Sequence, residues 1–297
     1  MTEQDFRAGF VSLVGRPNVG KSTLTNALVG HKVAITSSKP QTTRRTIRGI
    51  VHRDHGQLVL VDTPGIHRPR TLLGQRLNEL VEETLADVDL IAQLIPATDT
   101  VGPGDRYIRD AIDAFPRATK VAIVTKTDLA SKDDIGERLI EVDQMGSWDL
   151  IIPISALTGH QLDTLVDELI ALLPSSPPLY PEGDLVDDDD DTRIAELIRE
   201  AALEDVRDEL PHSLAVTIDE RIRDEGAAEK IFASVVVERE SQKRIIIGTG
   251  GERLKRIGIA ARQEIEAEIG HKVFLSLHVK VEKEWQRDAK KLGKLGF

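Results

Sequence analysis

The stretch that decides the fold of this 297-residue chain runs Gly15-Arg16-Pro17-Asn18-Val19-Gly20-Lys21-Ser22. Its spacing, G-x-x-x-x-G-K-[ST], is typical of a phosphate-binding loop. Glycines at both ends let the backbone turn tightly, so that successive N–H groups point inward at a phosphate. Lys21 would then reach the β- and γ-phosphates of a nucleotide, and Ser22 would offer its hydroxyl to Mg²⁺.

The flanks of this loop agree with that interpretation. Residues 10–14 form a short apolar run that predicts a buried strand, and residues 22–29 predict an amphipathic helix that ends at Gly30. A loop between a strand and a helix N-terminus adds the positive end of the helix dipole to the phosphate site. A glycine-rich turn without a ligand is the alternative, and the eight-residue pattern in this context disfavours it.

The composition sets limits on the class of protein. The chain is 40% hydrophobic and 30% charged, which allows a sizeable core and is long enough for two domains. Aromatic residues make up only 3%, so a nucleic-acid surface would not depend mainly on stacking. The net charge of −11 allows at most a local basic patch. Cysteine is absent, which excludes disulfides and fits a reducing cytoplasm.

A polar segment without periodicity follows the loop helix at residues 36–45. In a nucleotide switch, such a segment senses the γ-phosphate and supplies a threonine ligand to Mg²⁺. We expect Thr43 to be that ligand, with Thr42 as the alternative. A plain surface loop is the other interpretation of these residues.

A second apolar strand is predicted at residues 57–61, and it ends in Asp62-Thr63-Pro64-Gly65. An acidic residue at the end of such a strand can hold Mg²⁺ near the phosphates. Gly65 would donate its backbone N–H to the γ-phosphate and release it after hydrolysis. Alone this tetrapeptide would be an ordinary turn. Its position downstream of a phosphate loop favours a role in binding Mg²⁺ and the γ-phosphate.

Three further apolar runs, at residues 90–95, 121–124 and 150–154, predict strands separated by helical patterns. The second leads into Thr125-Lys126-Thr127-Asp128, where the Asp128 carboxylate would accept hydrogen bonds from the ring N–H and exocyclic amine of guanine. The stem of Lys126 would lie along the base. The third ends in Ser155-Ala156-Leu157, whose backbone N–H groups would meet the guanine O6.

Together these stretches resemble the G domain of the translation-factor class of GTPases. The resemblance implies a mostly parallel sheet flanked by helices, GTP or GDP as ligand, and Mg²⁺ held by Ser22, Thr43 and Asp62. It implies in-line attack of water on the γ-phosphate with Lys21, Asn18, Thr43 and Gly65 as the catalytic set. The nucleotide-binding residues it implies are Gly15, Arg16, Pro17, Asn18, Val19, Gly20, Lys21, Ser22, Thr23, Asp62, Thr63, Pro64, Gly65, Thr125, Lys126, Asp128, Ser155, Ala156 and Leu157.

Two positions depart from that family pattern. Thr125 stands where the family places an asparagine that braces the loop and approaches the purine N7, so guanine affinity would fall. Ile66 stands where Ras-like relatives place a glutamine that positions water. In relatives that share Asn18, this asparagine binds a K⁺ ion that bridges the phosphates. We therefore expect hydrolysis to be faster in K⁺ than in Na⁺.

The second half begins after a proline-rich stretch at residues 174–178. We place a G domain at residues 1–175, an acidic and proline-rich linker at 176–192, and a second domain with a basic C-terminal tail at 193–297. The acidic run at 187–191 is interpreted as solvated linker. Beyond it we expect a helix at 192–209, strands at 213–218 and 231–237, a helix at 252–269 and a strand at 273–281.

This order resembles a smaller α+β KH domain of the bacterial type (type II), an RNA-binding module whose G-x-x-G loop is here Gly248-Thr249-Gly250-Gly251. Glycines let a nucleic-acid backbone approach a helix N-terminus. Residues 230–297 hold fifteen Lys and Arg against nine Asp and Glu, a net +6 in an acidic chain. The predicted RNA-binding residues are Lys243, Arg244, Gly248, Thr249, Gly250, Gly251, Arg253, Lys255 and Arg256.

One G domain followed by one KH domain resembles the Era family of bacterial ribosome-associated GTPases over nearly the whole chain. The resemblance implies binding to small-subunit (16S) ribosomal RNA near its 3′ end and assistance in 30S subunit assembly. Two alternatives stay open: a GTP-binding RNA scaffold with little turnover, and a related GTPase of tRNA modification. We expect a cytoplasmic monomer without a stable protein partner, and peripheral contact with the inner face of the cell membrane is left open.

Overall fold

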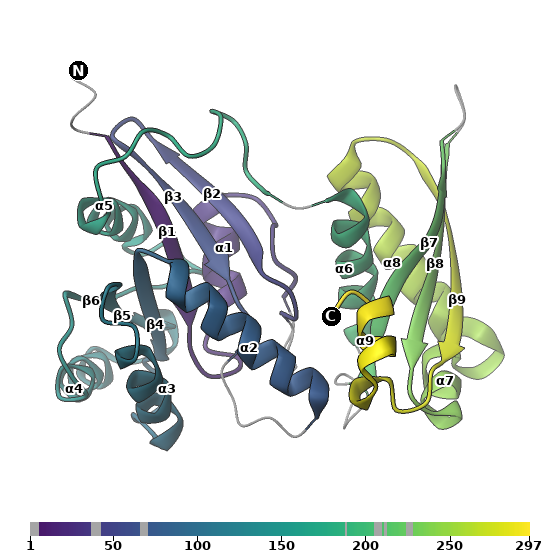
Figure 1. Cartoon of the computed structure of the whole chain (residues 1–297), viewed down its shortest axis with the longest axis horizontal. Coiled ribbons are helices and arrows are strands. Elements are labelled where there is room, and N and C mark those ends of the chain that lie inside the picture. Colours follow the sequence, from purple (N-terminus) through teal and green to yellow (C-terminus); the bar gives the residue numbers. More distant parts are fainter. Residues whose placement is uncertain are drawn as a thin grey trace. The chain divides into compact units, whose positions relative to one another are not determined.

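The computed structural model describes residues 6–36, 43–65, 71–187, 189–204, 210, 213–223 and 228–297. Thr42 and Ile66, which the sequence singled out, lie outside these residues. The chain divides into two compact units, and the boundary between their main parts falls after Asp187. Each unit has its own sheet (Figure 1).

The first unit contains a six-stranded sheet in the order β2-β3-β1-β4-β5-β6. Strand β2 pairs with β3 in antiparallel fashion, and every other neighbouring pair is parallel. The predicted mostly parallel sheet is therefore confirmed, while β2 itself was not predicted. The strands are β1 (Arg7–Val14), β2 (Ile47–Arg53), β3 (Gly56–Asp62), β4 (Leu90–Pro96), β5 (Thr119–Thr125) and β6 (Leu150–Pro153).

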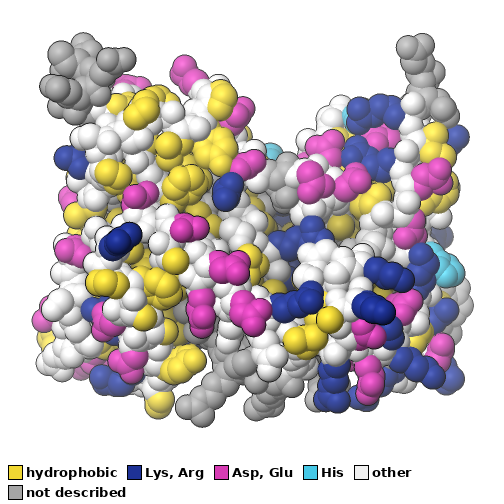
Figure 2. All heavy atoms as spheres, viewed as in Figure 1, with side chains coloured by type: hydrophobic (Ala, Val, Ile, Leu, Met, Phe, Trp, Pro, Cys, Tyr) yellow, Lys and Arg dark blue, Asp and Glu magenta, His cyan; other side chains and the backbone are white. Residues whose placement is uncertain are grey.

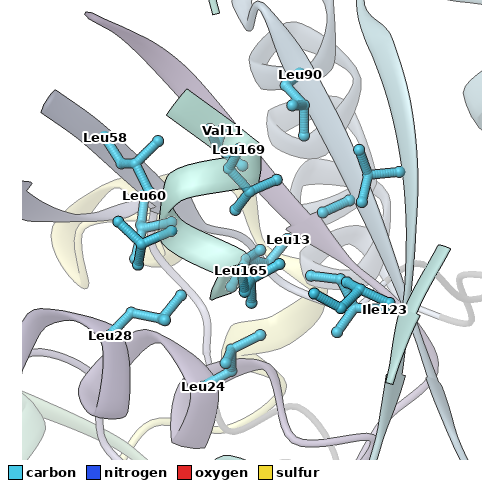
Figure 3. Packing of buried hydrophobic residues seen from close by; sticks show 14 of the residues in the cluster. Val11, Leu13, Leu24, Leu28, Leu58, Leu60, Leu90, Ile123, Leu165 and Leu169 are labelled. Carbon is cyan, nitrogen blue, oxygen red and sulfur yellow. The ribbon is translucent and has the colours of Figure 1, made fainter. Parts of the chain in front are cut away.

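Helices cover both faces of this sheet because its central strands carry apolar side chains on both sides. On one face, Val11 and Leu13 of β1 pack with Leu24 of α1 and with Leu165 and Leu169 of α5 (Figure 3). The opposite face packs against α2 and α3. The helices are α1 (Lys21–Val29), α2 (Leu72–Asp87), α3 (Pro103–Asp113), the short 3₁₀ helix η1 (Thr127–Leu129), α4 (Lys132–Asp143) and α5 (Leu162–Leu172).

The second unit has a three-stranded sheet in the order β7-β8-β9. Strands β7 and β8 are antiparallel, and β8 and β9 are parallel. Helix α6 packs against α8 and β7, and α8 packs against β9. The elements are α6 (Asp190–Leu203), β7 (Ala215–Ile222), β8 (Glu229–Val237), α7 (Glu240–Ile247), the 3₁₀ turn η3 (Thr249–Gly251), α8 (Glu252–Ile269) and β9 (Val273–Val281).

The C-terminal segment is folded and does not form a free basic tail. It contains the 3₁₀ helix η4 (Trp285–Arg287) and helix α9 (Ala289–Lys294). Trp285 is fully buried, and its ring stacks on that of Phe297 with centroids 5.7 Å apart. The lysines of this segment therefore stand on an ordered surface of the second unit.

The acidic run between the units differs from the solvated linker that the sequence predicted. Asp187 pairs with Arg48 of the first unit at 3.0 Å. The Asp189 carboxylate accepts the Thr192 N–H at 2.9 Å and caps α6. Asp190 and Asp191 both pair with Arg221. Specific cations and backbone groups thus bind these carboxylates.

Within the residues that the structure describes, no helix is both long enough and apolar enough to cross a membrane.

Candidate functional site

The phosphate-binding loop joins β1 to α1, as predicted. A side chain in place of Gly15 or Gly20 would be sterically unfavourable. A Cβ on Gly15 would lie 2.9 Å from the carbonyl oxygen of Leu94 and 2.7 Å from a methyl group of Val19. Gly20 caps α1 with φ +103°, a conformation that side chains rarely adopt. The loop backbone is therefore fixed before any ligand contributes.

Lys21 is held inside this loop. It is only 8% exposed, and its Nζ donates to the carbonyl oxygens of Gly15 at 3.2 Å and Arg16 at 3.4 Å. Burial lowers the pKa of the ammonium group, and the nearby Asp62 carboxylate opposes that shift. The two carbonyl contacts place the charged end of Lys21 where the loop amides would hold a phosphate.

The three predicted metal-binding residues meet at one point. The hydroxyls of Ser22 and Thr43 donate to Asp62 Oδ2 at 2.9 and 3.1 Å, and the two hydroxyl oxygens are 3.2 Å apart. The other carboxylate oxygen, Asp62 Oδ1, is buried without a hydrogen-bond partner among the described residues. Hard oxygen donors with an unsatisfied buried carboxylate oxygen suit Mg²⁺.

The environment of the Asp62 carboxyl group favours binding of a cation. Burial raises its pKa, against the opposing effects of Lys21, Ser22 and Thr43. A divalent cation at this point would compensate the buried charge. The structure places Thr43 at Asp62, and Thr42 lies outside the described residues.

Gly65 lies beside the phosphate loop, as its predicted role requires. A Cβ on Gly65 would sit 3.6 Å from the Lys21 Nζ, 3.7 Å from the Gly15 carbonyl oxygen and 3.9 Å from the Pro17 ring. Thr63 is fully buried, and its hydroxyl donates to the Leu13 carbonyl at 3.5 Å. The Asp62–Gly65 turn thus connects the predicted metal-binding carboxylate to the phosphate loop.

Thr125 makes a contact that braces the phosphate loop. Its buried hydroxyl donates to the Val19 carbonyl oxygen at 2.8 Å. Next to it, Lys126 has φ +58° and its Nζ donates to the Asn18 carbonyl oxygen at 2.7 Å. Asn18 is exposed, with φ +64°. These two contacts fasten the predicted base-recognition loop to the phosphate loop.

The side chain of Ser155 positions Asp128, whereas the sequence analysis predicted a role only for the Ser155 backbone N–H. The Ser155 hydroxyl donates to Asp128 Oδ1 at 2.6 Å and accepts the Thr158 N–H at 3.1 Å. The Ser155 N–H itself donates to the His160 carbonyl at 3.2 Å. The Ser155 N–H thus has a backbone acceptor in this structure, and its predicted contact with guanine O6 stays a prediction. The neighbouring N–H groups of Ala156 and Leu157 keep the predicted role.

Arg16, which was predicted to bind the nucleotide, is anchored by an ion pair that the sequence does not predict. The Arg16 Nε donates to Asp105 at 2.8 Å, and a terminal nitrogen reaches Asp99 at 3.4 Å. Asp105 is fully buried and also accepts the Gly102 N–H at 2.9 Å, which caps α3. The Arg16 side chain therefore ties the loop to α3. No sequence pattern pairs these distant positions.

In the second unit, the predicted glycine loop lies between α7 and α8. Gly248, Gly250 and Gly251 have φ of +73°, +60° and +83°. A Cβ on Gly248 would lie 2.7 Å from the Cβ of Arg253, whereas at Gly250 and Gly251 no described residue beyond the adjacent backbone comes within 4 Å of that position. The outer face of the loop is thus open to a ligand backbone, at the N-terminus of the long helix α8.

The predicted RNA-binding cations differ in exposure. Arg244, Lys255 and Arg256 are exposed, and Lys243 is half-buried. Arg253 is also half-buried, and its guanidinium donates to the carbonyl oxygens of Ile245 and Glu204. It therefore braces the loop as well as adding charge. Lys and Arg side chains gather on the visible face of this unit (Figure 2).

Comparison with known proteins gives the same two-part organisation. The family model described as "50S ribosome-binding GTPase" matches residues 10–127, and a KH-domain model matches residues 209–286. GTPase Era of Nocardioides sp. is 58% identical over 301 residues, covering 98% of this chain and 96% of the relative. GTPase Era of Mycolicibacterium smegmatis is 58% identical and covers 100% of both.

Two solved structures of Era match the whole chain at 36% identity and a TM-score of 0.94, covering 98% of this chain and 99% of theirs. One is a variant of Aquifex aeolicus Era bound to GDP·AlF4⁻. The other is Era in complex with MgGDPNP and nucleotides 1506–1542 of 16S ribosomal RNA. With relatives of this identity along its full length, the chain belongs to the Era family of GTPases.

Proposed function

We propose that this protein is a GTP-hydrolysing switch that binds small-subunit ribosomal RNA near its 3′ end and assists assembly of the 30S subunit. The observation that carries the proposal is the pairing, in one chain, of an assembled Ser22–Thr43–Asp62 cluster with an open glycine loop beside exposed cations. The relative in complex with nucleotides 1506–1542 of 16S ribosomal RNA supports the choice of RNA.

The chemistry is in-line attack of water on the γ-phosphate of GTP. Ser22, Thr43 and Asp62 hold Mg²⁺, which neutralises phosphate charge when it is bound. Lys21 and the loop amides stabilise the charge that develops on the phosphate oxygens. Gly65, adjacent to the Lys21 Nζ, donates its N–H to the γ-phosphate. We assign no side chain as general base.

Guanine is selected by Asp128, whose carboxylate accepts from the ring N–H and the exocyclic amine. The hydroxyl of Ser155 fixes that carboxylate at 2.6 Å, which supports its role in discrimination. The hydrogen bond from the Thr125 hydroxyl to the Val19 carbonyl oxygen holds the base-recognition loop against the phosphate loop. Affinity for guanine nucleotides then depends on both loops together.

We propose that Asn18 binds K⁺ next to the phosphates. Its side chain is exposed at the rim of the loop, with the backbone fixed by Lys126. GTP hydrolysis should be faster in KCl than in NaCl, and Asn18→Ala should remove the difference. Equal rates of the wild type in both salts would rule out this role. The cytoplasmic location, monomeric state and membrane contact stay predictions.

The test of RNA binding is crosslinking in cell extract with the GTP-loaded protein. We expect recovery of the 3′ end of small-subunit RNA from the wild type and its loss from Gly251→Asp, which puts a carboxylate on the open face of the loop. Lys255→Glu/Arg256→Glu repeats the test without strained backbone, because both side chains are exposed. Arg117→Glu/Lys132→Glu, at two exposed positions of the first unit, is the charge-matched control for this double variant.

Two outcomes would contradict the proposal. If the RNA is not enriched, or if the loop variants retain it, the second unit does not act as an RNA-binding module. If GTP binds tightly without multiple turnovers, even with RNA present, the protein is a nucleotide-stabilised scaffold rather than a GTPase.

A further inference from the structure

Arg16, the second residue of the phosphate loop, makes its charged contacts outside the loop. Its Nε donates to Asp105 Oδ1 at 2.8 Å, and a terminal nitrogen reaches Asp99 at 3.4 Å. The Asp105 side chain is fully buried, whereas that of Asp99 is about half exposed. A short charged hydrogen bond to a buried carboxylate is stronger than a long one that water screens. Asp105 is therefore the main partner of Arg16.

Asp105 is itself held in place by groups other than Arg16. Its Oδ2 accepts the Gly102 N–H at 2.9 Å, which caps the start of α3. Its backbone carbonyl oxygen accepts Nε2 of Gln93 at 2.8 Å. Gln93 is fully buried in β4, the strand between β1 and β5 in the sheet. The sheet and the first turn of α3 thus fix the carboxylate that holds the Arg16 side chain.

A glycine on α3 leaves room for the Arg16 side chain. A Cβ on Gly104 would lie 2.9 Å from Cδ and 3.4 Å from Cγ of Arg16. The first distance is well inside the ordinary separation of two non-bonded carbon atoms. An Arg16 side chain that kept its bond to Asp105 could not avoid such a methyl group without a shift of the loop or of α3. The absence of a side chain at Gly104 therefore belongs to the same arrangement.

The part of the loop that contains Arg16 lies on the side of the proposed γ-phosphate site. A Cβ on Gly65 would lie 3.7 Å from the Gly15 carbonyl oxygen and 3.9 Å from the Pro17 ring, and these two residues flank Arg16. Gly65 is the residue whose N–H is proposed to bind the γ-phosphate. A displacement of Arg16 would therefore move the loop next to the phosphate that is transferred to water.

The position of Lys21 depends on the same stretch of backbone. Its Nζ donates to the carbonyl oxygens of Gly15 at 3.2 Å and Arg16 at 3.4 Å. A shift of the Arg16 backbone moves one of these two acceptors and, with it, the ammonium group. Because Lys21 stabilises charge that develops during hydrolysis, a small displacement of this group lowers the rate of the chemical step.

We propose that Asp105 is a positioning residue for GTP hydrolysis, which acts through Arg16 to hold the γ-phosphate side of the loop and the Lys21 ammonium group. This role rests on the proposed function, because the chemistry belongs to Lys21 and Gly65. It adds a residue of α3 that lies outside every nucleotide-binding motif of the chain. The pair supports the chemical step and contributes little to the binding of GDP, which lacks the γ-phosphate.

The test is Gly104→Ala, which disturbs the Arg16 side chain without removing a charge or a hydrogen-bonding group. Alanine favours a helix more than glycine does, so the substitution does not weaken α3 through helix propensity. The single-turnover rate constant of GTP hydrolysis should fall about tenfold, while the Kd for GDP should stay within about twofold of the wild type. Quenched-flow kinetics and calorimetric titration measure the two quantities, and the retained GDP affinity shows that the variant is folded.

A matched control lies on another helix of the same unit. Gly136 is in α4, and no described residue outside the neighbouring helix backbone comes within 4 Å of a Cβ placed there. Gly136→Ala makes the same change of helix propensity without a contact to Arg16. It should hydrolyse GTP and bind GDP as the wild type does, so the difference between the two variants isolates the displacement of Arg16.

Removal of each charged partner separates this role from the cap that Asp105 makes on α3. Arg16→Met and Asp105→Asn should each lower the single-turnover rate about tenfold or more. The double variant should be no slower than the slower single variant, because both substitutions remove the same contact. Arg16→Lys keeps the positive charge and should hydrolyse GTP faster than Arg16→Met.

Three results would overturn the positioning role. One is a Gly104→Ala protein that hydrolyses GTP as fast as the Gly136→Ala control. Another is a double variant in which the effects of Arg16→Met and Asp105→Asn add, since Asp105 would then act through α3 alone. The third is a loss of GDP affinity as large as the loss of rate, which would mean that the pair shapes the whole nucleotide site. A failure of the proposed function looks different: the wild type itself would bind GTP without hydrolysing it.

Discussion

The two candidate sites of this protein are built in opposite ways. In the nucleotide site, buried Thr43 and Asp62 and half-buried Ser22 are hydrogen-bonded to one another. In the glycine loop of the second unit, a Cβ placed at Gly250 or Gly251 would have no described residue within 4 Å apart from the adjacent backbone. One site is preorganised around a small ligand, and the other leaves an open surface for a polymer backbone.

This difference predicts how each site responds to mutation. Removing a buried polar group leaves its partners unsatisfied, so the cost is large and specific. Removing an exposed cation weakens an electrostatic attraction that neighbouring charges share, so the cost is small and depends on salt. The predictions below test this contrast, beginning with the largest expected effect.

Asp62→Asn should lower kcat for GTP hydrolysis by about a thousandfold, because it removes the negative charge of the proposed Mg²⁺ site beside Ser22 and Thr43. Single-turnover kinetics across a Mg²⁺ titration measure the effect. Asp143→Asn, an exposed carboxylate at the end of α4, is the control and should hydrolyse GTP normally. A variant within tenfold of the wild type would show that Asp62 is not a metal-binding group.

The second unit also contains buried ion pairs, and the cluster around Glu229 lies away from the glycine loop in the sequence. Glu229 is 2% exposed and accepts hydrogen bonds from Arg221, Arg223 and His271. Burial favours the protonated form, but the bonds from Arg221, His271 and Arg223 outweigh it and lower the pKa of Glu229 to about 2. This unit should therefore lose stability in acid.

The direction in which stability changes with pH follows from the lowered pKa of Glu229. The unfolded chain binds the proton of Glu229 at a higher pH than the folded chain, so stability is complete above the ordinary pKa of 4.5 and is lost as pH falls toward 2. We expect Glu229→Gln to remove up to about 3 kcal/mol of this pH dependence. Amide exchange in β7, β8 and β9 at pH 6 and pH 3 measures it. Equal pH profiles would contradict the assignment.

Thr125→Val should weaken GDP binding about tenfold. The substitution leaves the buried Val19 carbonyl without its 2.8 Å donor, a loss of about 1–3 kcal/mol. Thr125→Ser keeps the hydroxyl and should bind GDP nearly as the wild type does, which separates the hydrogen bond from side-chain shape. Calorimetric titration with GDP gives the comparison. If valine and serine bind alike, the brace has no role in affinity.

The contrast between the sites also explains what could be predicted from sequence. The phosphate loop and the glycine loop depend on local backbone conformations, so Gly20 and Gly251 were visible in short motifs. Likewise, the central strands of the first unit form continuous apolar runs that predict burial on both faces. The apolar residues on the two sides of these strands then required helices on both faces, which the structure contains.

The contacts that the sequence did not predict join residues that are distant in the chain. Asp105 binds Arg16, and Asp187 binds Arg48 from a run of acidic residues that looked like solvated linker. An acidic residue in a loop has the same local pattern whether water or an arginine faces it. Strand β2 was not predicted for a related reason: as a strand at one edge of the sheet, it owes its position to pairing with β3 and to the bridge between Gly49 and Val186.

The smallest expected effect belongs to the open site. Lys255→Ala/Arg256→Ala should weaken binding of a single-stranded RNA about three- to tenfold at physiological salt, because each exposed cation neutralises at most one phosphate. The slope of log affinity against log salt should become shallower by about 1.4, or 0.7 per contact. Fluorescence anisotropy between 50 and 300 mM KCl measures both quantities.

A loss of affinity without a change of slope would mean that these side chains act through hydrogen bonds or through the shape of the loop. The second unit would then resemble the nucleotide site, with binding determined by a few specific contacts. A reduced slope instead assigns Lys255 and Arg256 to general attraction for the RNA backbone. Specificity would in that case reside in the surfaces next to the loop, where the half-exposed side chains of Ile245 and Ile259 offer apolar contacts to bases.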